Sequence, residues 1–322
     1  MNLRSIGGSA LRVSPVGLGC WQFSRGKGLG GSYWPPLPDR VTAEIVRRSL
    51  EGGINWFDTA EAYGWGASEE ILTETLTMLG RTPAEVSIAT KWWPFPRTAR
   101  SITGTIGKRK AALNGFPISL YQVHQPLSFS AVEREMDGMA ALARSGDIRF
   151  IGVSNFNEKR MRRAAARLRS NGLTLVSNQV RYNLLDRGIE SNGILDAAGE
   201  LGITIIAYSP LAQGVLTGRF HTAAPADYRA IGIRRFLKDF RGSSLEKSRP
   251  LIILLGEIAA RHGATCAQVA LAWLLAYRGE MVVVIPGATR PAQAEENAGA
   301  MNLTLSADEI DAIDRESRKA SL

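Results

Sequence analysis

The sequence predicts a (β/α)8 barrel, a ring of eight parallel strands in which each strand is followed by a helix. Two observations favour this fold. Eight apolar, β-branched runs recur along the 322 residues, mostly about thirty residues apart, as strand-and-helix units require. Segments with helical periodicity and helix caps lie between most of the runs. We expect the whole chain, residues 1–322, to form a single domain of this kind.

The eight expected strands begin near Val16, Ile54, Val86, Ile118, Ile148, Leu173, Ile203 and Met281. Ahead of them, the first residues read as a short β-hairpin that turns at Gly7 and Gly8. We expect this N-terminal hairpin to close the bottom of the barrel.

Two of the intervening segments illustrate the expected helices. After Asp39, apolar residues recur at helical spacing until Gly52. In the segment "SAVEREMDGMAALARSG", Ser130 and Glu133 have the spacing of a capping box, and Gly146 is placed as the C-cap.

The competing fold is a doubly wound open sheet, which would have a GxGxxG turn after an early strand. The nearest match, Gly64-Trp65-Gly66, lacks the third glycine. A long irregular segment between Gln213 and Leu245 interrupts the repeat after the seventh strand. Loops of this length in a compact domain are usually lids or binding loops, so we expect long loops on the carboxyl-terminal face of the barrel.

Composition narrows the class of protein. With 45% hydrophobic and 21% charged residues, the chain is typical of a globular enzyme. The sequence shows neither a signal peptide nor an apolar run of about 20 residues, so we expect a cytoplasmic protein without a membrane partner. Cys20 and Cys266 are far apart, and CxxC and HExxH patterns are missing, so we expect reduced thiols and no metal. The net charge of +9 comes from scattered basic residues, which argues against a nucleic-acid partner.

Reactive side chains follow three successive strands. Asp58 and Tyr63 follow the second expected strand, Lys91 ends the third, and His124 ends the fourth. In a barrel, the carboxyl ends of neighbouring strands meet at one face, so these four residues can converge. Each alone has an ordinary explanation, as a packing residue, a surface charge or a core histidine.

Together the four residues suit proton donation from a phenol. A free tyrosine has a pKa near 10 and is a poor acid at neutral pH unless its anion is favoured. A lysine ammonium beside the hydroxyl favours the anion, a histidine can hydrogen-bond a substrate oxygen, and a buried aspartate holds the lysine. Such a group protonates a carbonyl oxygen while a hydride reaches the carbon.

An ordered set of motifs then resembles the aldo-keto reductase superfamily over nearly the whole chain. The motifs are "FDTAEAYG", "ATK", "YQVHQP", "GVSNF", "SNQVRYN", "AYSPLAQGVLTG" and "IPGATRPAQAEENAGA". The resemblance implies a barrel that binds NADP(H) in extended form, with Asp58, Tyr63, Lys91 and His124 as the catalytic tetrad and Tyr63 as general acid or base.

The resemblance also implies a set of cofactor-binding residues. Ser154, Asn155 and Gln179 would hydrogen-bond the nicotinamide carboxamide, and Tyr208 would stack on its ring. The remaining residues lie along the path of the pyrophosphate and adenosine or beside the nicotinamide: Trp21, Asp58, Ser209, Pro210, Leu211, Gly214, Arg219, Arg229, Gly287, Thr289, Arg290, Gln293, Glu296 and Asn297. Arg290 would face the 2′-phosphate, helped by Arg219 and Arg229, because a guanidinium fork matches phosphate oxygens.

Two positions depart from the family pattern. Cys20 stands where many relatives have a threonine, and Gly287 stands where many have a lysine. The second departure weakens the expected preference for NADPH, so NAD(H) remains an alternative cofactor. The form with Gly287 and Gln293 occurs in a branch that includes bacterial reductases and the potassium-channel beta subunits.

The expected substrate is a small-molecule carbonyl or alcohol, sugars included. We expect Trp21, Trp34, Tyr63, Trp92 and His124 to contact it, with Trp93 and Tyr33 nearby, as an aromatic-lined pocket suited to apolar or aryl carbonyls. The alternative function is a cofactor-binding regulatory module like the channel beta subunits, in which turnover is slow or incidental. A homo-oligomer is compatible with either.

Overall fold

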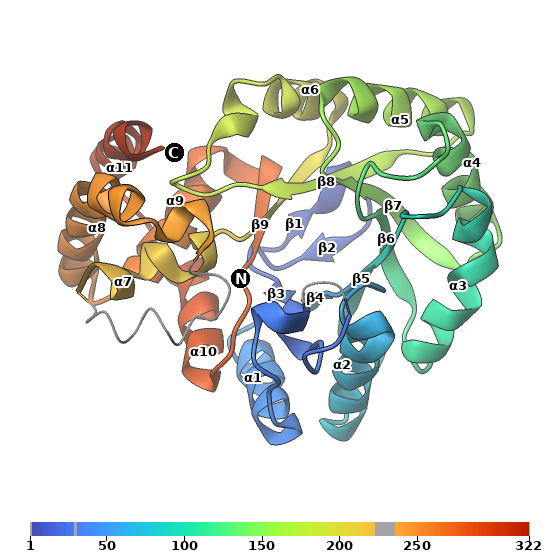
Figure 1. Cartoon of the computed structure of the whole chain (residues 1–322), viewed down its shortest axis with the longest axis horizontal. Helices are drawn as coiled ribbons and strands as arrows, with labels where there is room; N and C mark the ends of the chain where they lie inside the picture. The colour runs from blue at the N-terminus through green and yellow to red at the C-terminus, as the bar shows by residue number, and fades with distance from the viewer. Residues whose placement is uncertain (1, 29–30, 223–235, 322) are drawn as a thin grey trace.

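Eight parallel strands form the barrel in the computed structural model, which describes residues 2–28, 31–222 and 236–321 (Figure 1). Neighbouring strands in the sheet follow the chain order from β3 to β10. Parallel bridges from Val16 to Val284 and from Gly19 to Gly287 join the first strand to the last and close the ring. The strands are β3 (Leu18–Gly19), β4 (Trp56–Asp58), β5 (Ser87–Trp92), β6 (Ile118–Val123), β7 (Ile148–Ser154), β8 (Leu175–Arg181), β9 (Thr204–Tyr208) and β10 (Val282–Ile285). The predicted barrel is confirmed, and each expected run contains or adjoins one of these strands.

Helices surround the strands, as Figure 1 shows. They are α1 (Asp39–Glu51), α2 (Ala67–Met78), α3 (Arg100–Ala112), α4 (Val132–Arg144), α5 (Glu158–Ser170), α6 (Ile194–Leu201), α7 (Arg219–Thr222), α8 (Gly242–His262), α9 (Cys266–Tyr277), α10 (Pro291–Gly299) and α11 (Ala307–Ala320). The described parts of the long segment after β9 contain α7, the start of α8 and short 3₁₀ turns, whereas residues 223–235 of this segment lie outside the described residues.

The N-terminal hairpin covers the amino-terminal end of the barrel, as expected. Its strands β1 (Arg4–Ser5) and β2 (Arg12–Val13) pair antiparallel. At the turn, Gly7 has a φ of 57° and donates its N–H to Oγ1 of Thr204, the first residue of β9. A Cβ on Gly7 would lie 2.4 Å from the Val176 carbonyl oxygen, so the close approach of the two backbones requires glycine.

One helix start differs from the sequence prediction. The prediction of a capping box at Ser130 and Glu133 is wrong, because the N-cap of α4 is Ala131 and no side chain caps this helix. The Ser130 hydroxyl instead accepts a hydrogen bond of 2.9 Å from the backbone N–H of Ala99, which precedes α3. The serine therefore links two loops and does not cap its own helix.

Candidate active site

The four predicted reactive side chains lie together at the carboxyl-terminal mouth of the barrel. Lys91 in β5 forms a buried ion pair with Asp58, the last residue of β4, and donates to the Thr59 carbonyl at 2.9 Å. Its Nζ also lies 3.4 Å from the Tyr63 hydroxyl. The His124 ring packs edge-on against Tyr63, with ring centroids 5.5 Å apart.

Two glutamine side chains fix the Asp58 carboxylate from its other side. Gln179 of β8 donates to Oδ2 at 2.7 Å, and Gln122 of β6 donates to the same oxygen at 3.3 Å. Asp58 therefore has partners on both oxygens, and its charge orients Lys91 from a fixed position. Gln122 was not among the residues singled out from the sequence. Its place two residues before His124 on one strand, and so on the same face of the sheet, was the available signal.

The environment sets the charge state of each group. Burial raises the pKa of the Tyr63 phenol, and the opposing effect of the Lys91 ammonium is smaller. Burial alone would lower the pKa of Lys91, but the Asp58 carboxylate and Tyr63 outweigh it and raise the pKa. Burial, together with the Lys91 charge, lowers the pKa of His124 well below its usual value. At neutral pH the site therefore contains a protonated phenol, a charged lysine and a neutral imidazole.

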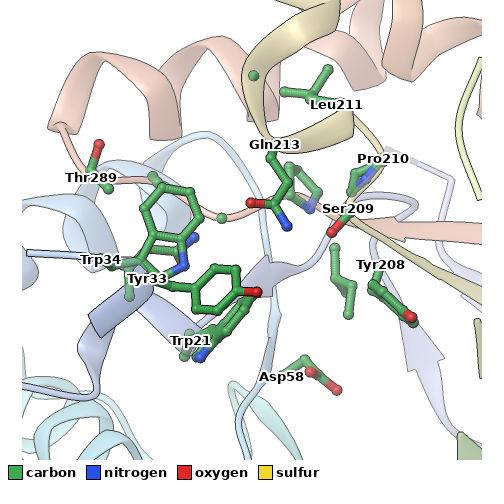
Figure 2. Close-up of a pocket in the computed structure, with 18 of the residues that line it drawn as sticks. Trp21, Tyr33, Trp34, Asp58, Tyr208, Ser209, Pro210, Leu211, Gln213 and Thr289 are labelled. Carbon is green, nitrogen blue, oxygen red and sulfur yellow. The ribbon is translucent and has the colours of Figure 1, made fainter. Parts of the chain in front are cut away.

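These groups lie at one end of a cavity of about 780 Å³. Figure 2 shows Trp21, Tyr33 and Trp34 on one side of this cavity and Tyr208, Ser209 and Pro210 on the other. The predicted residues that line it are Trp21, Trp34, Asp58, Tyr63, His124, Ser154, Asn155, Gln179, Tyr208, Ser209, Pro210, Leu211, Gly214, Arg219, Gly287, Thr289, Arg290, Gln293, Glu296 and Asn297. Lys91 lies behind the wall with no exposed surface, and Arg229 lies outside the described residues.

A continuous series of aromatic rings forms the wall around Tyr63. Trp21 stacks on Tyr63 with centroids 6.1 Å apart, and Tyr33 and Trp34 pack on Trp21 at 5.2 and 6.3 Å. On the opposite side of Tyr63, His124 is followed by Trp93, whose ring lies edge-on to it at 5.3 Å. The glycine-rich loop after β3 therefore contributes two rings to the pocket, as expected.

The expected contact of Trp92 with a substrate is wrong. Trp92 has no exposed surface, lies outside the cavity wall and donates its indole N–H to the Ser101 hydroxyl of α3 at 3.0 Å. Successive residues of a strand face opposite sides of the sheet, so an inward Lys91 places Trp92 toward the helices. Trp93, just beyond the strand end, reaches the cavity instead.

Polar side chains at the carboxyl ends of β7 and β9 form a connected group on the cavity wall. The Tyr208 hydroxyl donates to Oδ1 of Asn155 at 3.1 Å, and the amide nitrogen of Asn155 donates to the Ser154 hydroxyl at 3.1 Å. Ser209 and Gly214, in the turn that follows β9, have φ angles of 48° and 102°. This group orients the Tyr208 ring before any ligand arrives.

The far end of the cavity lies at the start of α10. The side-chain oxygen of Gln293 accepts from the backbone N–H groups of Thr289, at 2.8 Å, and Arg290, at 3.2 Å. Gln293 therefore caps this helix itself. Arg290 and Arg219 are exposed at this end of the cavity.

Gln22 is a cavity residue that the sequence did not indicate. It is buried, it lines the cavity, and its side-chain oxygen has no hydrogen-bond partner among the described residues. A Cβ on Gly287 would lie 2.3 Å from the Gln22 amide nitrogen, so Gln22 fills the space that a side chain at position 287 would need. This packing gives a physical reason for the glycine.

The described ranges contain neither a metal-ligand cluster nor a membrane-spanning helix. The residues within these ranges form no group of three or more His, Cys, Asp or Glu side chains suited to holding a metal ion. None of the helices within them is both long enough and apolar enough to span a bilayer.

The structure is a (β/α)8 barrel with four titratable side chains, Asp58, Tyr63, Lys91 and His124, gathered at its mouth. The chain belongs to the aldo/keto reductase family, whose model matches residues 15–317. Two of its relatives align with most of the chain. An uncharacterized oxidoreductase of Mycobacterium tuberculosis is 40% identical over 94% of this chain and 88% of its own length. The chloroplastic pyridoxal reductase of Arabidopsis thaliana is 32% identical over 93% of this chain and 82% of its own.

Solved structures agree with this family. The glycerol dehydrogenase of Gluconobacter oxydans is 26% identical, with a TM-score of 0.82 over 98% of this chain and 94% of its own. A thermostable aldo-keto reductase in complex with the inhibitor epalrestat is 28% identical, with a TM-score of 0.76 over 98% of this chain and 100% of its own. Family and relatives together support an oxidoreductase that acts on carbonyls or alcohols.

Proposed function

We propose that this protein is an NADP(H)-dependent reductase of aldehydes or ketones, able to run in reverse on alcohols or sugars. One observation carries the proposal. Tyr63 lines the cavity, and the Lys91 ammonium, held by Asp58, lies 3.4 Å from its hydroxyl. A protonated phenol that a fixed cation supports can donate a proton to a carbonyl oxygen and stabilise the phenolate that remains.

Each residue then has a role in proton transfer. Tyr63 donates the proton in reduction and accepts it in oxidation, and Lys91 stabilises the anionic phenolate. His124, neutral because of its burial, orients the substrate oxygen toward Tyr63. Asp58 holds Lys91 in place through the buried ion pair. Trp21, Trp34 and Trp93 exclude water around the carbonyl and favour apolar or aryl substrates.

The cavity fits a dinucleotide. It extends from the tetrad past the turn after β9 to the start of α10, and its wall carries an aromatic ring, amides and hydroxyls on the way. Asn155, Ser154 and Gln179 would hold the nicotinamide end, and Tyr208 would pack against it. The side chains of Arg290 and Arg219 at the far end suit the extra phosphate of NADP(H). Bound there, the cofactor supplies the hydride.

A steady-state assay with NADPH and 4-nitrobenzaldehyde tests the reaction. We expect wild type to consume NADPH and Tyr63→Phe to lose at least about 100-fold in kcat because the proton donor is gone. The dissociation constant for NADPH, measured by tryptophan fluorescence, should change little in this variant. No consumption by a wild type that binds NADPH would favour the regulatory module, and full turnover by the variant would exclude Tyr63 as the acid.

Cofactor choice is tested separately at Arg290. In Arg290→Ala, the dissociation constant should rise for NADPH and stay nearly constant for NADH, because only NADPH carries the 2′-phosphate. The same ratio of the two constants in wild type and variant would show that Arg290 does not read this group.

A further inference from the structure

Glu61 is a buried carboxylate in the loop between Asp58 and Tyr63 that the proposed chemistry does not use. Only 5% of its surface is exposed. Its Oε2 accepts a hydrogen bond of 3.0 Å from the backbone N–H of Trp93. Arg97 neutralises it, with Nη1 at 2.8 and 3.0 Å from its two oxygens. Glu61 therefore joins the loop that carries Tyr63 to the loop that follows β5.

Trp93 is the residue through which Glu61 reaches the cavity. The Trp93 ring lines the cavity and packs edge-on against His124, at 89° and with centroids 5.3 Å apart. The backbone of Trp93 is fixed at both polar groups, because its N–H binds Glu61 and its carbonyl accepts from Arg97 at 3.4 Å.

The orientation of His124 depends on this packing. Its Nδ1 is buried and has no hydrogen-bond partner among the described residues. The ring is instead held between Tyr63 on one side and Trp93 on the other, both edge-on. In most catalytic histidines one nitrogen is fixed by a hydrogen bond, whereas packing has to do so here.

We propose that Glu61 is a positioning residue that fixes Trp93 and, through it, the His124 ring. The expected effect on turnover rests on the proposed function, whereas the effect of Glu61 on the position of the His124 ring does not. A loss of the Trp93 N–H bond would let the loop shift and the imidazole rotate. A displacement of about 1 Å at a group that orients the substrate costs on the order of 10- to 100-fold in rate.

Arg97 fastens the same loop on its outer side. Its backbone carbonyl accepts from the N–H of Phe129, in the loop that follows His124, at 2.9 Å. The ion pair with Glu61 therefore connects the loops after β4, β5 and β6, which are the loops that carry or adjoin the reacting side chains. A neutral residue at position 61 would avoid the cost of desolvation but could not form this ion pair. The connection of the three loops therefore explains why a carboxylate is buried here.

The ring of His124 can be observed directly by NMR. The chain has three histidines, so the His124 ring-proton signal can be assigned from its disappearance in His124→Gln. Neighbouring aromatic rings shift this signal, so it reports how Trp93 and Tyr63 lie. In Glu61→Ala we expect it to move or broaden, whereas Glu61→Gln, which retains an acceptor for the Trp93 N–H, should leave it nearly in place. Glu70→Ala, at an exposed position of α2, is the matched control.

If Glu61→Ala does not fold, Glu61→Asp decides the matter, because the shorter carboxylate keeps the charge but cannot reach both Trp93 and Arg97. An unmoved His124 signal in a folded Glu61→Ala or Glu61→Asp overturns the proposal. So does an equal shift in Glu70→Ala.

Kinetics then measure the functional effect. For aryl aldehydes, kcat/KM should fall at least about tenfold in Glu61→Ala and stay within about twofold of wild type in Glu61→Gln. The NADPH dissociation constant should not change in either variant, which a general loss of structure would not allow. A wild type without turnover would defeat the proposed function alone, since the NMR result would still decide the role of Glu61.

Discussion

Two buried ion pairs lie back to back across one strand of the barrel and differ in what they can do. Lys91 and Asp58 pair inside the mouth of the barrel, and Arg109 and Glu69 pair outside it, 2.6 Å apart, between α2 and α3. The two adjacent residues of β5 serve one pair each, because Lys91 points inward while the hydroxyl of Thr90 donates to Glu69 at 2.6 Å. The two pairs are therefore similar in burial and in charge, and they differ in the side of β5 on which they lie.

The comparison shows that a buried charge does not by itself mark a site. The inner pair adjoins a cavity and has a phenol within 3.4 Å that can take up or release a proton. The outer pair does not line this cavity, and its nearby phenol, Tyr121, is buried without a hydrogen-bond partner among the described residues. We therefore assign reactivity to the inner pair and a structural role, the linking of α2 to α3, to the outer one.

The largest expected effect is on kcat, which should depend on the inner pair and not on the outer one. Lys91→Met removes the cation behind Tyr63 at nearly constant volume, so the phenolate loses its support. We expect kcat to fall by about three orders of magnitude, measured with NADPH and 4-nitrobenzaldehyde. Arg109→Met is the matched control and should retain kcat within about twofold per folded molecule. Equal losses in the two variants would remove the distinction between the pairs.

The next effect separates them by stability. Arg109→Met leaves Glu69 buried without its cation, and breaking a buried pair costs about 3 kcal/mol of unfolding free energy. Urea denaturation followed by circular dichroism measures this loss. A stability within about 0.5 kcal/mol of wild type would show that Glu69 accepts a proton at little cost and that the outer pair is dispensable.

The alternation of side chains along a strand also explains which features could be predicted from the sequence. The barrel was predictable because eight apolar runs and helical spacing repeat along the chain, and the ends of neighbouring strands have to meet. Trp92 was misplaced although the signal was present, since an inward Lys91 requires its neighbour to face the helices. Gln122 was also missed although its position two residues before His124 was an available signal. Gln22 has no such signal, because the role of an amide depends on which distant residue the closed barrel brings beside it.

The last expected effect concerns pH and tests the outer pair alone. Burial, only partly offset by Arg109, raises the pKa of Glu69 from 4.5 to about 7. Because the folded state holds this proton more tightly than the unfolded state, the stabilisation is complete below pH 4.5 and is lost as the pH rises through 7. In Glu69→Gln this dependence disappears, while the uncompensated Arg109 adds a cost that does not vary with pH.

The free energy of unfolding of wild type, minus that of Glu69→Gln, should therefore fall by about 3 kcal/mol between pH 4.5 and 8. Urea titrations of both proteins at several pH values give this difference. Ionisation of Glu69 must not change the inner pair, so kcat for Glu69→Gln should follow the wild-type pH profile. A shifted pH profile of kcat would mean that the two sides of β5 are coupled through Thr90 and Lys91. The outer pair would then affect the reaction and not only the structure.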